Sequence, residues 1–137
     1  MNNNDSQESQ LIIQEYAKNP INNYKMNNPT VTQHEWNFIC GDDITIYLKI
    51  KDNHIQEYSF DGNCSSITLA SASLLAELII NKEINEITTR TYDTLKTHGL
   101  IVSNRRKNAA VIALLASIKA IYRYLWQNKQ IDFDDLY

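Results

Sequence analysis

The chain has 137 residues and a mass of 15.8 kDa, a length that suits one compact domain with its own core. Hydrophobic residues make up 43% and charged residues 21%, which excludes disorder of the whole chain. The net charge of −3 gives no general attraction to nucleic acid. No stretch is apolar enough for a membrane span, so the sequence predicts neither a nucleic-acid-binding protein nor a membrane protein.

The two ends of the chain are polar. Residues 1–10 lack the apolar stretch of a signal peptide, so we expect a flexible leader there. A single domain is then expected over residues 11–128, followed by a C-terminal tail over 129–137. Two cysteines, Cys40 and Cys64, are too few for a disulfide-stapled secreted scaffold, so we expect free or metal-bound thiols in the cytoplasm.

The first segments of the domain predict one helix and one loop. Residues 9–18 carry Leu11, Ile12 and Tyr16 near helical spacing, and the segment ends at Asn19-Pro20 because the residue before proline avoids the α region. The Asn-rich segment 21–30 predicts a loop.

Three predicted strands follow the loop. Residues 31–39 are rich in β-favouring types, and residues 44–51 alternate apolar and polar side chains with the period of a half-buried strand. Residues 55–60 alternate again after the turn residues Asp52-Asn53. Three consecutive strands joined by short turns predict an antiparallel meander.

The rest of the chain predicts helices. Residues 67–80 are rich in Ala and Leu, residues 85–97 are weakly helical, and residues 105–128 have a wide apolar face. Strands followed by helices predict an α+β fold in which helices pack on one face of a three-stranded antiparallel sheet.

Two places in this arrangement carry residues with chemistry. Cys40 ends a predicted strand in a turn where Gly41 lets the backbone bend, so that the thiol and the carboxylate of Asp42 can face one pocket. Cys64 and Ser65 precede the helix over 67–80, and a meander brings this point near Cys40. On spacing alone, a buried cysteine pair remains the commoner interpretation of two thiols.

Other polar residues give weaker evidence for a function. Arg105, Arg106 and Lys107 form a local basic patch, for which a solvated turn is a commoner role than contact with nucleic acid. Ser71 and Ser73 have no accompanying His and Asp pattern, so a serine hydrolase is not supported. No residue set predicts catalytic turnover, and we expect a carrier or assembly factor, not an enzyme.

The combined order of motifs resembles the NifU/IscU/SufU family of iron–sulfur cluster assembly scaffolds. The resemblance covers Leu11 to Leu125. It rests on Asn19-Pro20, Cys40-Gly41-Asp42, Phe60-Asp61-Gly62, the small-residue helix that begins near Ile67, and Arg105-Arg106-Lys107-Asn108-Ala109.

The chain departs from the family at two of its three cysteine positions. An alignment without a gap places Cys64 on a glycine of the family, Ser65 on the second cysteine and Asn108 on the third. A shift of one residue restores Cys64 as a ligand, and both alignments stay open. An asparagine oxygen is a poor partner for the iron or zinc that thiolates hold well.

The resemblance implies a transient [2Fe–2S] cluster or iron as the bound group, with zinc as an alternative metal. It implies that Cys40, Asp42, Cys64, Ser65 and Asn108 surround the bound group and that Cys40, Asp42 and Cys64 are the metal ligands. The implied partners are a cysteine desulfurase, which donates sulfur, and apo iron–sulfur acceptor proteins.

Three functions remain open on this fold. The first is a scaffold with a loosened site, and the second is a metal-free sulfur acceptor in which Cys40 takes a persulfide. The third is a cluster-free paralogue that only docks to a desulfurase or to another scaffold. The retained Cys40-Gly41-Asp42 turn and Cys64 favour the scaffold.

Overall fold

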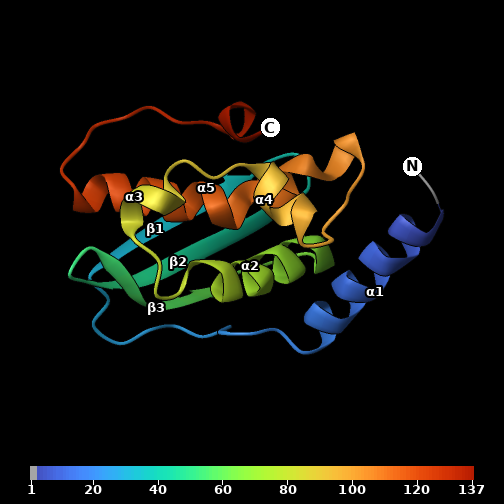
Figure 1. The fold of residues 1–137 in the computed structure, drawn as a ribbon, viewed down its shortest axis with the longest axis horizontal. Coiled ribbons are helices and arrows are strands. Elements are labelled where there is room, and N and C mark those ends of the chain that lie inside the picture. Colours follow the sequence, from blue (N-terminus) through green and yellow to red (C-terminus); the bar gives the residue numbers. More distant parts are fainter. Residues whose placement is uncertain (1–2) are drawn as a thin grey trace.

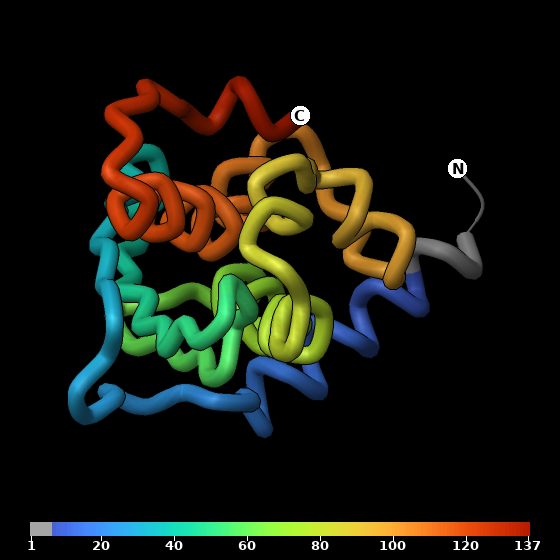
Figure 2. Tube along the Cα trace, turned by 60° about the vertical axis from the view of Figure 1, so that its left-hand side comes forward, coloured from blue at the N-terminus to red at the C-terminus, as the bar shows by residue number. Residues whose placement is uncertain are grey.

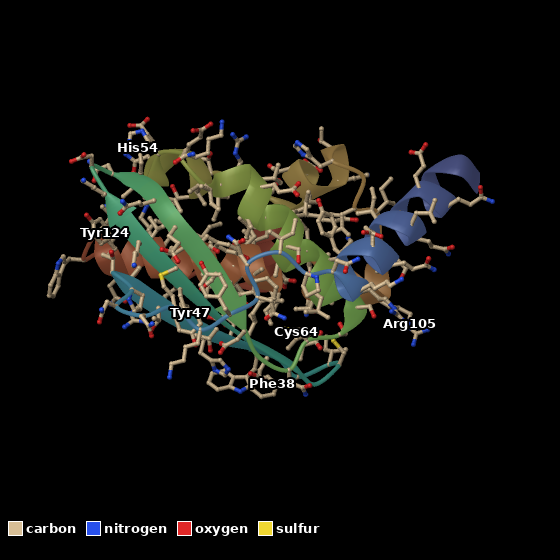
Figure 3. All side chains as sticks on the ribbon, turned by 90° about the horizontal axis from the view of Figure 1, so that it is seen from below. Phe38, Tyr47, His54, Cys64, Arg105 and Tyr124 are labelled. Atoms are coloured by element: carbon tan, nitrogen blue, oxygen red, sulfur yellow. The ribbon has the colours of Figure 1, made fainter. Side chains whose placement is uncertain are left out.

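The computed structural model describes residues 3–137, with side chains from residue 7 on. Three strands, β1 (Val31–Asn37), β2 (Asp42–Lys51) and β3 (His54–Asp61), form an antiparallel sheet in the order β1-β2-β3. The helices α2 (Ser66–Ile79) and α5 (Lys107–Tyr124) lie on the same face of this sheet (Figures 1 and 3). The α+β architecture expected from the sequence is confirmed.

The core forms between the sheet and these two helices. Along β2, Ile44, Ile46 and Leu48 are fully buried, and the intervening Thr45 is half-buried, as the period of a strand requires. The apolar faces of α2 and α5 complete the core. The turn between β2 and β3 consists of Asp52 and Asn53, both at positive φ, which suits a two-residue hairpin.

The first helix starts earlier than expected. Helix α1 spans Asn3–Lys18 and packs against α2, so the expected leader over 1–10 is helical from Asn3 on. Ser9 is buried, and its hydroxyl donates a hydrogen bond to the carbonyl of Ile101 at 2.8 Å and accepts one from the amide of Ile101 at 3.0 Å. These contacts attach this part of α1 to the domain. Met1 and Asn2 lie outside the described residues.

The region over residues 85–97, which the sequence predicts to be weakly helical, corresponds to two short helices, α3 (Ile84–Ile87) and α4 (Tyr92–Thr97). The side chain of Thr91 accepts a hydrogen bond from the amide of Asp93 and so caps α4. Gly99 follows the end of α4 at a φ of +97°, a conformation that glycine adopts without strain.

The last helix is shorter than expected, and the tail folds back on it. A 3-10 turn over Asn104–Arg106 precedes α5, which ends at Tyr124 instead of near residue 128. Trp126 has a φ of +59° and so cannot continue the helix. The expected tail contains a second 3-10 turn, η2 (Phe133–Leu136), and Leu136 is buried against α5 (Figure 2).

None of the helices in the described part of the chain is both long and apolar enough to span a membrane.

Candidate functional site

The turn between β1 and β2 presents Cys40 to solvent. Gly41 makes this turn possible with a φ of +74°, and its amide donates a hydrogen bond to the carbonyl of Asn37 at 2.8 Å. The Cys40 sulfur accepts a hydrogen bond from Nδ2 of Asn37 at 2.6 Å and donates one to Oδ2 of Asp42 at 3.5 Å. The thiol is therefore exposed but held in place.

Asp42 joins this hairpin to the start of α2. Asp42 is 4% exposed. Besides the bond from Cys40, its carboxylate accepts three hydrogen bonds from the start of α2, from the amide of Ser65 at 2.8 Å, the hydroxyl of Ser65 at 2.9 Å and the hydroxyl of Thr68 at 2.7 Å. Ser65 is the N-cap residue of α2, but its own side chain makes no capping bond. Asp42 supplies the negative charge that a helix N-terminus favours, so its first role is to fix the hairpin on the helix.

A cleft of about 540 Å³ opens beside Cys40. It is lined by residues from the hairpin, from the start of α2 and from the segment that enters α5, namely Ile39, Cys40, Ser65, Ile67, Asn104, Arg105, Arg106, Asn108 and Ala109. Three of the five predicted site residues, Cys40, Ser65 and Asn108, therefore line one cleft. Asp42 contacts two of them.

Cys64 is placed differently. It is not among the residues that line this cleft, although Figure 3 shows it toward the same end of the sheet as Phe38 of the hairpin. Its thiol donates to the carbonyl oxygen of Asp43 at 3.5 Å. Burial raises the pKa of Cys64 to about 12, and the nearby carboxylates, that of Asp42 first among them, add to the rise. The side chain is a half-buried neutral thiol at neutral pH.

Cys40 is also protonated more readily than an ordinary thiol. Partial burial and the adjacent Asp42 carboxylate raise its pKa, because both disfavour the thiolate. The hydrogen bond from the Asn37 side chain acts in the opposite direction. A positively charged group brought close to Cys40 would therefore be needed to make it a strong nucleophile.

Asn108 has a partner of its own. Its Oδ1 accepts a hydrogen bond from the hydroxyl of Tyr137, and the ammonium group of the neighbouring Lys107 lies 4.8 Å from the centre of the Tyr137 ring. The segment around Tyr137 is thus attached to the wall of the cleft. The amide oxygen of Asn108 is engaged within the chain.

The donor set does not fit a resident zinc ion. Among the residues with described side chains, no three His, Cys, Asp or Glu side chains lie close enough together to hold a metal. A closed zinc site has four ligands in a tetrahedron, drawn from Cys, His and carboxylate side chains, whereas this cleft offers one thiol with the Asp42 carboxylate beside it. The ligand set Cys40, Asp42 and Cys64 therefore stays a prediction.

Sequence reasoning missed three residues of this site. Thr68 lies within the predicted helix over 67–80, and it is fully buried and bonded to Asp42. Asn37 lies three residues before Cys40 and contacts its sulfur, which a turn of that length could have suggested. Nothing in the sequence pattern indicated that Tyr137 reaches Asn108, since the two are 29 residues apart.

Comparison with known proteins gives one family and several relatives. The model of the family described as NifU-like N terminal domain matches residues 7–131. An iron–sulfur cluster assembly scaffold protein IscU of Thermotoga maritima is 39% identical over 55% of this chain and 53% of its own length. A protein named IscU 1 of Archaeoglobus fulgidus is 28% identical over 86% of this chain and 77% of its own. The matched segment thus spans about half of the first relative.

A further relative is named differently. A zinc-dependent sulfurtransferase SufU of Bacillus subtilis is 34% identical over 53% of this chain and 49% of its own length. Among solved structures, a putative scaffold protein for the SUF system from Fervidobacterium islandicum has a TM-score of 0.71 at 20% identity, covering 80% of this chain and 93% of its own. A NifU-like protein from Brucella abortus has a TM-score of 0.68 at 20% identity, covering 86% and 94%. These two structures share the fold of this chain.

Proposed function

Because the chain belongs to the family of NifU-like N-terminal domains, we propose that it acts in iron–sulfur cluster assembly as a scaffold-like carrier in the cytoplasm. Its sulfur comes from a cysteine desulfurase, and its cargo, iron or a transient [2Fe–2S] cluster, passes to apo acceptor proteins. The observation that carries this proposal is an exposed thiol, Cys40, in a cleft beside a carboxylate, Asp42. The role is that of a carrier, without turnover of its own.

The proposed ligands of this cargo are Cys40, which lines the cleft, and Asp42, which lies beside Cys40. Cys64 would join them only after a movement of the turn over 61–65, because its thiol now contacts the Asp43 carbonyl. Ser65 and Asn108 line the cleft but offer only neutral oxygen, which holds iron weakly. These ligands suit a cargo that is bound only briefly.

Anaerobic reconstitution tests this proposal. The protein is incubated with ferrous iron, L-cysteine and a cysteine desulfurase, and visible absorption is recorded beside protein-bound iron. We expect charge-transfer bands in the wild type and in Asn108→Ala, but not in Cys40→Ser. Equal spectra for the wild type and Cys40→Ser would refute a cargo site at Cys40.

A second candidate function is a metal-free sulfur acceptor on the same fold. The observation that favours it is that only one of the two thiols lines the cleft, while the oxygen of Asn108 is taken by Tyr137. One thiol suffices to accept a persulfide sulfur and pass it on. The name of the Bacillus subtilis relative, a sulfurtransferase, agrees with this alternative.

Iron dependence separates the two functions. If the protein is a metal-free sulfur acceptor, it should gain the mass of one sulfur atom in an iron-free reaction with desulfurase and L-cysteine. It should then pass this sulfur to an apo iron–sulfur protein. If sulfur reaches the apo iron–sulfur protein only when iron is present, the scaffold function is favoured. If added iron changes nothing and none is retained, the metal-free acceptor is favoured.

A further inference from the structure

The cleft beside Cys40 has a positively charged wall. Arg105 and Arg106 both line it and both are exposed (Figure 3 labels Arg105). Within residues 7–137, neither guanidinium forms an ion pair. Asp42 forms no ion pair with either arginine, and both of its oxygens accept hydrogen bonds from α2 and its cap.

The two arginines lie where their charge is unfavourable for the fold. They immediately precede α5, and the first turn of that helix contains no acidic residue. The N-terminus of an 18-residue helix disfavours cations, so these charges do not stabilise the helix. Lys107, by contrast, has a partner in the ring of Tyr137. Two unpaired cations at such a place indicate a role in binding an anion.

The size and the remaining lining of the cleft indicate a small ligand. A volume of about 540 Å³ is typical of sites for small molecules. Ile39 and Ile67 provide apolar contact, and a guanidinium group matches a carboxylate with two parallel hydrogen bonds. Cys40 lines the same space.

We propose that this cleft binds a low-molecular-weight thiol that carries carboxylates, in its persulfide or disulfide form, and that Arg105 and Arg106 hold its carboxylates while its sulfur exchanges with Cys40. This inference rests on the proposed function, in the form in which Cys40 accepts a persulfide sulfur. It adds a second source of sulfur, a small anionic donor, to the protein donor.

The exchange is balanced without an external oxidant. The Cys40 sulfur loses its proton to solvent and attacks the outer sulfur of the donor persulfide. A bond forms between these two sulfurs, the S–S bond of the donor breaks, and the donor leaves as a thiolate. Cys40 then carries the persulfide. With a disulfide in place of the persulfide, the same attack gives a mixed disulfide on Cys40 and releases one thiolate.

Reaction with disulfides of different charge tests this inference. The probes are glutathione disulfide, which carries carboxylates, and 2-hydroxyethyl disulfide, which is neutral, and the readout is the rate of the mixed disulfide on Cys40 by intact mass. We expect the ratio of the anionic to the neutral rate to fall by about tenfold in Arg105→Gln/Arg106→Gln, and to fall also in the wild type at high salt. The rate with the neutral probe should not change, which shows that Cys40 remains accessible in the variant.

A matched control removes the same charge elsewhere. Lys82→Gln/Arg90→Gln neutralises two cations that line a different cavity, and it should keep the wild-type ratio. If Arg105→Gln/Arg106→Gln also keeps the ratio, the inference is overturned. If that variant keeps the ratio and loses only sulfur transfer from the desulfurase, the arginines serve an acidic protein partner instead. A wild type that takes no sulfur from the desulfurase, yet prefers the anionic disulfide, would refute the proposed function alone.

Discussion

The most informative single residue of the site is Asp42, because it serves two purposes. The sequence placed its carboxylate beside the Cys40 thiol, and the 3.5 Å contact confirms that neighbourhood. The three hydrogen bonds from Ser65 and Thr68 were not predictable, because they depend on how the hairpin meets α2. A residue expected to be a ligand is thus also a structural link.

Removal of this carboxylate should cost stability. Asp42→Ala leaves the buried hydroxyl of Thr68 and the amide of Ser65 without their acceptor, and we expect the free energy of unfolding to fall by about 1–3 kcal/mol. Urea unfolding followed by circular dichroism measures this change. Asp43→Ala serves as the control, since Asp43 forms a half-exposed pair with His34 and its loss should cost less than about 1 kcal/mol. Equal losses would contradict the special role of Asp42.

The same carboxylate should slow the chemistry of Cys40. Burial and the charge of Asp42 raise the pKa of the thiol, so less thiolate is present at a given pH. Asp42→Asn removes the charge and should lower that pKa, which shifts the pH profile of iodoacetamide alkylation to lower pH. Cys64, with a pKa of about 12, should react more slowly than Cys40 in both proteins. A profile that does not move in Asp42→Asn would contradict this electrostatic assignment.

The metal affinity of the cleft should depend on the residues that replace cysteine. Ser65→Cys/Asn108→Cys adds two thiols to a cleft that already contains Cys40, with Asp42 beside it. We expect this variant to bind one zinc ion per chain in competition with a chromophoric chelator, because three thiolates and a carboxylate can complete a tetrahedron. The wild type should release zinc to the chelator. Tight zinc binding by the wild type would contradict this expectation, because it would require more zinc ligands than Cys40 and Asp42.

At the scale of elements, strand β2 carries part of the site. The alternating pattern over 44–51 predicted β2, but the strand begins two residues earlier, with Asp42 and Asp43. They pair with Asn37 and Trp36 of β1, so the strand extends into the motif itself. The sequence signal of a Gly-Asp-Asp turn concealed this, because the same residue types are common in loops.

Gly62 is the turn residue that tolerates substitution least. It has a φ of +137°, and a Cβ atom there would lie 2.4 Å from the carbonyl oxygen of Asp43. Gly62→Ala should therefore lower the free energy of unfolding by more than about 1 kcal/mol and displace the turn that carries Cys64. Gly41→Ala is the matched control, because Gly41 also has a positive φ but no atom lies within 4 Å of the added Cβ. Thermal unfolding of both variants makes the comparison, and a milder effect at Gly62 would contradict it.

At the scale of the whole molecule, the layered fold was predictable, but the packing of the C-terminal segment on it was not. The order of strands and helices predicted the layered arrangement, because a three-stranded meander with one apolar face must be covered by the helices that follow it. The predicted tail over 129–137 gave no periodic signal, yet its Leu136 is buried on α5 and its Tyr137 reaches Asn108. Contacts between residues so far apart in the chain depend on the finished fold.

The segment around Leu136 should contribute to global stability. Leu136→Ala removes a side chain that is only 2% exposed, and we expect the free energy of unfolding to fall by about 2–3 kcal/mol. Gln130→Ala, an exposed position in the same segment, is the control and should change it by less than about 0.5 kcal/mol. Chemical unfolding curves compare the two. Equal stability of both variants would mean that this segment does not belong to the folded domain.

In both candidate functions the reactive thiol is Cys40 and not Cys64, because Cys40 alone of the two lines the cleft. The most direct measurement is the intact mass of the wild type, Cys40→Ser and Cys64→Ser after incubation with a cysteine desulfurase and L-cysteine. We expect one added sulfur atom in the wild type and in Cys64→Ser, and none in Cys40→Ser. Sulfur on Cys40→Ser, or its loss from Cys64→Ser in a folded protein, would contradict it.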